Sequence, residues 1–158
     1  MTKKADFNAE EWAQVLEGPP LAAIAVITAQ RGGTIRESVS MAKGYAEARE
    51  EHSGNELLDE ILAAQPAVEP PKASSPEELR THVDEHLRGA VAVLEEKATP
   101  EEVAGYKAFA ISLAQRVAEA HKSGGVLGIG GEQVSDSERE AIEHVAAALG
   151  VDPPPATG

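Results

Sequence analysis

Residues 75–102 read SPEELRTHVDEHLRGAVAVLEEKATPEE, and the helix signals in this segment predict the fold class. A Ser-Pro pair opens the segment and a Thr-Pro pair lies near its end, and each Ser or Thr is followed three residues later by glutamate. This spacing is typical of a capping box, and proline suits the first helical position because its missing amide is not needed there. Between the two caps, aliphatic side chains recur at helical spacing at Leu79, Val83, Leu87, Ala90 and Leu94. The segment therefore predicts one amphipathic helix and the start of the next.

The same helix signals recur along the whole chain. Five capping boxes occur, namely Asn8 with Glu11, Thr34 with Glu37, Ser75 with Glu78, Thr99 with Glu102 and Ser135 with Glu138. At the first of them, Phe7 and Trp12 hold the two positions of a hydrophobic staple. The single strand candidate, residues 126–129, is too short and too glycine-flanked to found a sheet. The sequence therefore predicts an all-α fold.

The apolar stripes predict a helical bundle of about seven helices. A short helix is expected over residues 9–17, followed by the helix breakers Gly18, Pro19 and Pro20. Residues 21–29 are apolar all round, which indicates a separate helix buried in the middle of the bundle.

The bundle is expected to consist of two helical-hairpin units within one domain, residues 1–150. The halves are residues 8–64 and 75–150, and the Pro-rich segment 65–75 is the predicted linker between them. Residues 151–158 are rich in proline and predict a flexible tail.

The charge balance excludes several classes of protein. The chain has 158 residues, 42% of them hydrophobic, and 27 acidic against 14 basic residues give a net charge of −13. Such a chain is poorly suited to bind nucleic acid or anionic lipid, because both need clustered cationic side chains. It contains no cysteine, so disulfides, thiol nucleophiles and cysteinyl zinc sites are excluded. With neither a signal-peptide pattern nor a long apolar run, we expect a cytoplasmic protein without membrane insertion.

One short motif suggests a metal site. Residues 82–86 read HVDEH and match the H-x-x-E-H signature of inverzincin proteases. His82 and His86 are four residues apart and share a helical face, so they could share a metal. A protease of this kind needs a third ligand far downstream, for which this chain has little room. The alternative interpretation is two partly buried, hydrogen-bonded histidines, because His86 falls within the apolar stripe of its helix.

A second candidate metal site is acidic. Glu132, Asp136 and Glu138 could offer carboxylate oxygens to a divalent cation. Their spacing falls short of an EF-hand. The sequence favours a structural interpretation, in which Ser135 and Glu138 cap each other and Asp136 faces the positive end of the helix dipole.

The loop before this turn, residues 123–133, contains five glycines. It follows a helix and lacks a Lys-Ser/Thr ending, so it matches neither nucleotide-binding fingerprint. Its aliphatic side chains, Val126, Leu127 and Ile129, predict an apolar flap that either packs into the bundle or binds a partner.

The C-terminal part of the chain resembles the tellurite-resistance TerB-like helical family. The resemblance rests on Val117-Ala-Glu-Ala, a glycine turn, residues 134–142 (VSDSEREAI) and the closing Ala146-Ala-Ala-Leu149-Gly150. Ser135 and Glu138 match the family's turn, whereas its aspartate is replaced by Gly130-Gly131-Glu132-Gln133. The resemblance extends more faintly to residues 21–48. It implies an all-helical bundle, no established catalysis, and acidic turns as candidate sites for a divalent cation in a stress response.

These observations predict a non-catalytic cytoplasmic helical protein that binds a protein partner, with a divalent cation as the candidate cofactor. One alternative is a small metal-dependent enzyme that uses His82 and His86. Another is a structural component whose apolar faces form an oligomer by self-association.

Overall fold

The computed structural model describes residues 2–28, 35–51, 54–64, 72, 74–122 and 136–152. These residues form a 3₁₀ turn and six α-helices, and they contain no strand. The elements are η1 (Lys4–Asp6), α1 (Ala9–Thr28), α2 (Ile35–Glu51), α3 (Glu56–Ala63), α4 (Pro76–Lys97), α5 (Pro100–Lys122) and α6 (Asp136–Leu149). The predicted all-α helical bundle is therefore confirmed.

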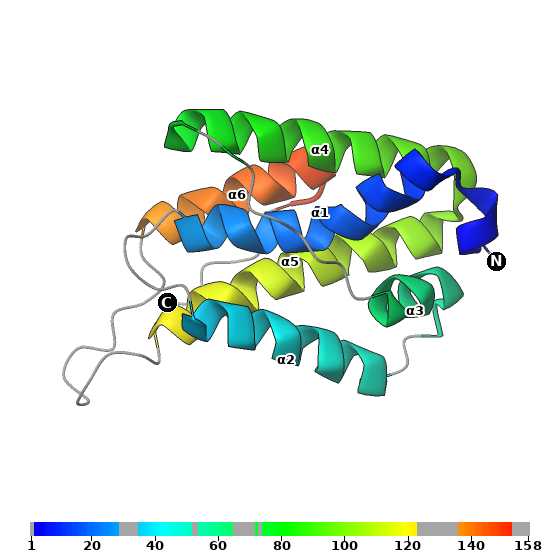
Figure 1. Cartoon of the computed structure of the whole chain (residues 1–158), viewed down its shortest axis with the longest axis horizontal. Coiled ribbons are helices and arrows are strands. Elements are labelled where there is room, and N and C mark those ends of the chain that lie inside the picture. Colours follow the sequence, from blue (N-terminus) through cyan, green and yellow to red (C-terminus); the bar gives the residue numbers. More distant parts are fainter. Residues whose placement is uncertain are drawn as a thin grey trace.

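Helix α1 occupies the middle of the bundle (Figure 1). It packs mainly against α5 on one side and α4 on the other, while α6 lies against both α4 and α1. Helix α2 covers the far side of α5, and the short α3 lies against α2 and α5. Because α1 belongs to the predicted first half and α4, α5 and α6 to the second, the described helices do not separate into two independent hairpins.

The hydrophobic core is aliphatic and combines residues from both predicted halves. One cluster joins Leu21 and Ala22 of α1 with Leu87 of α4, Ala110 of α5 and Leu149 of α6. All five side chains are buried. Removing this apolar surface from water is the main favourable term that holds the helices together.

The prediction of two separate helices at residues 9–17 and 21–29 is wrong. A single helix, α1, runs through Gly18, Pro19 and Pro20, so the described residues hold six α-helices and not seven. A proline in a helix interior removes the hydrogen bond to the carbonyl four residues earlier. For Pro19 this carbonyl belongs to Val15, and a buried orphan carbonyl would be costly.

Side chains from two other helices bond carbonyls in the turn before this proline pair, and one of these carbonyls is the one that Pro19 leaves without its helical donor. The Tyr106 hydroxyl on α5 donates a 2.7 Å hydrogen bond to the Val15 carbonyl oxygen. On α4, His86 Nε2 lies 3.0 Å from the Gln14 carbonyl oxygen. Because a carbonyl can only accept, this bond places a proton on Nε2. At the Val15 carbonyl, the tertiary structure thus supplies the donor that Pro19 lacks, which favours the continuation of α1 through this segment.

The structure confirms two predicted capping boxes in full. Asn8 and Glu11 exchange backbone-to-side-chain hydrogen bonds of 2.9 and 2.8 Å, and Thr99 and Glu102 do so at 3.0 and 3.3 Å. The predicted staple forms as well, with the Phe7 and Trp12 ring centroids 5.5 Å apart.

The remaining predicted caps are confirmed in part or lie outside the described residues. Ser75 accepts from the Glu78 amide at 3.1 Å, but the Glu78 carboxylate accepts from Ser74 N and not from the cap residue. Thr34 and Ser135 lie outside the described residues. An additional cap is formed by Asn55, whose side chain accepts from the Leu58 amide.

Thr2, before the first helical turn, is hydrogen-bonded to the turn between α4 and α5. Glu102 accepts hydrogen bonds from the Thr2 amide at 2.9 Å and from the Thr2 hydroxyl at 2.6 Å. Its side chain also accepts from the Thr99 amide, so one carboxylate serves both a helix cap and a long-range contact. Burial acts to raise the pKa of Glu102, but the bonds from Thr2 and Thr99 outweigh it and hold that pKa below its ordinary value.

Candidate functional site: a groove along α5

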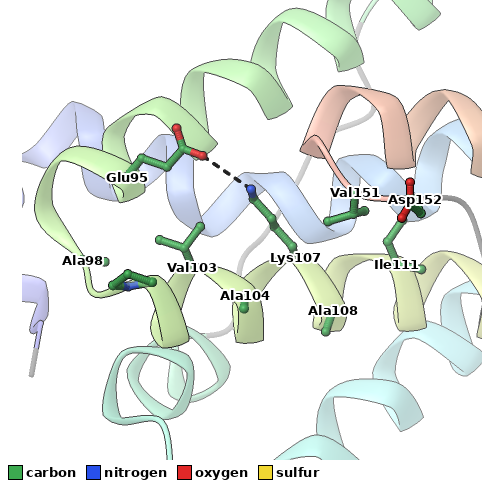
Figure 2. Close-up of a pocket in the computed structure, with 10 residues that line it drawn as sticks. Glu95, Ala98, Val103, Ala104, Lys107, Ala108, Ile111, Val151 and Asp152 are labelled. Atoms are coloured by element: carbon green, nitrogen blue, oxygen red, sulfur yellow. Dashed lines mark hydrogen bonds and ion pairs between the residues drawn. The ribbon is translucent and has the colours of Figure 1, made fainter.

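Three segments that are distant in the sequence enclose an apolar groove of about 700 Å³. Helix α5 lines the groove along its length, and the C-terminal end of α4 and the residues after α6 lie beside α5 toward opposite ends of it (Figure 2). The apolar lining includes Val103, Ala104, Ala108 and Ile111 of α5 together with Val151. A concave, mainly apolar surface of this size is typical of a binding site.

Three charged residues line this groove, namely Glu95, Lys107 and Asp152. Lys107 Nζ lies 3.5 Å from Glu95 Oε1, and the exposed fractions of the two side chains are 14% and 61%. Lys107 is therefore shielded and has an acidic partner, whereas Glu95 faces solvent. Glu95 and Asp152 lie toward opposite ends of the groove in Figure 2.

The end of α6 fixes the position of Val151 and Asp152. Gly150 adopts φ 73°, and its amide bonds the Ala147 carbonyl while the Val151 amide bonds the Ala146 carbonyl. This pair of bonds is the Schellman motif, which requires a left-handed residue that glycine provides without strain. Val151 lies at the start of the predicted tail, and its side chain packs against the core. One end of the groove is therefore formed by the residues that follow the C-terminal cap of α6.

The floor of the groove depends on two small residues of α5. Ala104 and Ala108 are exposed and one helical turn apart, on a side of the helix distinct from its buried stripe of Tyr106, Ala110 and Leu113. Larger residues at 104 and 108 would fill the groove. None of the residues predicted as a site lies on this surface, although the alanines of α5 outside its core stripe are a signal of it in the sequence.

The residues predicted as a partner-binding flap, Val126, Leu127 and Ile129, lie outside the described residues. Glu132 of the predicted acidic site also lies outside them. Its two companions have different environments, since Asp136 is fully exposed and 3.6 Å from Arg139, whereas Glu138 is 3% exposed.

The two histidines of the HVDEH motif also differ in environment. His82 is exposed, whereas the His86 side chain is 16% exposed and bonds the Gln14 carbonyl. Their ring centroids are 6.4 Å apart. Within the part of the chain that the structure describes, no three His, Asp or Glu side chains are grouped so that they could hold a metal ion. His86 therefore has a structural role at α1, and a metal at this motif stays a prediction.

Comparison of the chain with protein-family models, curated proteins and solved structures finds no match. The TerB-like resemblance stays a prediction. Among the helices described, none is both long and apolar enough to cross a membrane.

Proposed function

We propose that this chain is a non-catalytic, TerB-like helical protein that binds a protein partner through the groove along α5. The observation that carries the proposal is the groove itself, an apolar concavity of about 700 Å³. Concave, mainly apolar surfaces of this kind are the places where proteins most often bind ligands or partners.

The chemistry of the lining supports binding rather than a reaction. The charged groups are two carboxyl groups and one ammonium, and the ammonium is paired with Glu95. The groove therefore offers an apolar surface with charges at its ends, an arrangement that resembles the core and rim of a protein interface. The TerB-like relationship, the cytoplasmic location, the stress response and a divalent cation near Asp136 are parts of the proposal that rest on the sequence alone.

Site-specific photocrosslinking tests this function. We expect a benzoylphenylalanine at Glu101, which adjoins the groove residue Pro100, to form a discrete adduct with one protein in cells that express the chain natively. The same probe at Glu47, an exposed residue of α2, is the control and should give no such adduct.

A groove-filling variant supplies the second arm of this test. Ala104→Gln with Ala108→Gln should remove most of the Glu101 adduct, because the new side chains occupy the floor without changing the net charge. An adduct that persists in this variant, or equal labelling from Glu47, would show that the partner binds elsewhere.

A further inference from the structure

We infer that the partner's contact segment is a basic amphipathic α-helix, an inference that rests on the proposed function. Its apolar face would lie on the floor formed by Ala104 and Ala108. Its basic side chains would meet the carboxylates of Glu95 and Asp152 at the two ends of the groove.

The shape of the groove favours a helix as the occupant. Its α5 lining runs from Pro100 to Ile111, which at 1.5 Å per residue is a length of about 16 Å, or three helical turns. The exposed side chains along this floor at Ala104 and Ala108 are single methyl groups. Small residues one turn apart allow a second helix to approach closely, and docking of an apolar helical face into a groove is a common mode of peptide recognition.

The charges of the groove favour a basic occupant. Glu95 and Asp152 are exposed, and the cation between them, Lys107, is paired with Glu95. The lining therefore carries one more negative than positive charge, on a chain whose net charge is −13. Complementary charges at the rim of an interface set its specificity and the rate of association.

The same charges disfavour two other occupants. A second copy of the chain would bring its own net charge of −13 and the same acidic groove ends. An acyl carboxylate bound at Lys107 would lie beside the carboxylate of Glu95 and would also face Asp152. Both occupants therefore bring like charges together, which opposes binding.

The test uses two synthetic peptides of about 14 residues, or four helical turns. Both carry the same leucine and alanine face, with lysines at both ends in one peptide and glutamates in the other. Fluorescence anisotropy measures their affinity for the full chain. We expect the lysine peptide to bind at least about tenfold more tightly, the effect of two ion pairs formed rather than two repulsive contacts.

Paired variants locate the binding. Ala104→Gln with Ala108→Gln should lower the affinity for the lysine peptide by about tenfold or more, because a filled groove excludes the helix. The matched control is Ala42→Gln with Ala46→Gln, the same change at the same spacing on the exposed face of α2, which should leave the affinity unchanged. If the affinity falls equally in the α5 variant and in the α2 control, or falls in neither, the peptide binds by net charge alone and the inference is wrong.

A second pair of variants tests the charges. Glu95→Gln with Asp152→Asn should reduce the preference for the lysine peptide by about tenfold. Glu50→Gln with Glu51→Gln removes the same charge from exposed positions of α2 and should preserve the preference. An equal loss of preference in both pairs would contradict the assignment of Glu95 and Asp152.

The outcomes also separate this inference from the proposed function. If neither peptide binds while the Glu101 crosslink forms and is lost on filling the groove, a protein partner binds there but is not a basic helix. If decanoate binds the groove instead, or if sedimentation shows a dimer that the filled groove abolishes, the occupant is an acyl anion or a second copy, and the inference is wrong.

Discussion

Replacement of Gly18 with alanine is expected to destabilise the protein by about 3 kcal/mol, the cost of inserting an atom into a closely packed contact. A Cβ atom at this position would lie 2.0 Å from the Tyr106 hydroxyl oxygen. Tyr106 is fully buried and cannot move away without losing its bond to the Val15 carbonyl. Helix propensity alone predicts the opposite sign, a gain of about 1 kcal/mol for alanine over glycine. The sign of the change in the free energy of unfolding, measured by urea denaturation, therefore shows whether the steric contact with Tyr106 or helix propensity dominates.

Tyr106→Phe provides the matched background for this experiment. Alone, it should cost about 1–2 kcal/mol, because the Val15 carbonyl beside Pro19 loses its donor. In that background the nearest ring atom would lie 3.2 Å from the new Cβ, so Gly18→Ala should cost far less than in the native chain. Additive costs in the double variant would mean that Gly18 and Tyr106 are not coupled as the structure indicates.

Replacement of Glu102 with glutamine is expected to cost about 2 kcal/mol near neutral pH, as the loss of charge-assisted hydrogen bonds implies. The Glu102 pKa is lowered in the folded state, so its contribution is fully present above the ordinary carboxyl value of 4.5. That contribution is lost as the pH falls through the folded pKa. The native chain should therefore lose melting temperature on acidification more steeply than the variant.

The neighbouring Glu101 provides the control for this pH dependence. Its side chain is exposed, and Glu101→Gln removes the same formal charge from the same turn. We expect this control to melt close to the native chain and to keep the native pH profile. Parallel profiles for Glu102→Gln and the native chain, measured by circular dichroism from pH 7 to acid, would contradict the role assigned to Glu102.

Sequence patterns predicted the helices where local signals and tertiary packing agree. The stripe of α4 is buried at Val83, Leu87, Ala90 and Leu94, as its spacing requires. At α1 the local signals and the tertiary packing disagree, because the sequence Gly18-Pro19-Pro20 by itself predicts the end of a helix. The donor that replaces the hydrogen bond lost at Pro19 comes from Tyr106, which lies far along the chain. No local pattern around residue 18 contains that information.

The candidate site was less predictable than the fold for a similar reason. The groove forms where α5 meets the end of α4 and the residues after α6, so its shape depends on how three distant segments pack. A glycine after Leu149 is typical of a helix end, but it does not indicate that the Val151 side chain packs against the core. The interpretation of both histidines as partly buried and hydrogen-bonded is confirmed for His86, which lies in the apolar stripe of α4, and the partial burial predicted for His82 is wrong, because its side chain is exposed.

Amide chemical-shift mapping of the ¹⁵N-labelled chain, titrated with the lysine peptide, tests the groove as the binding surface most directly. We expect the largest shifts to cluster at Ala104, Ala108, Ile111 and Val151, with saturation at one peptide per chain. Shifts centred on the exposed face of α2, or spread evenly over the acidic surface without saturation, would contradict binding in the groove.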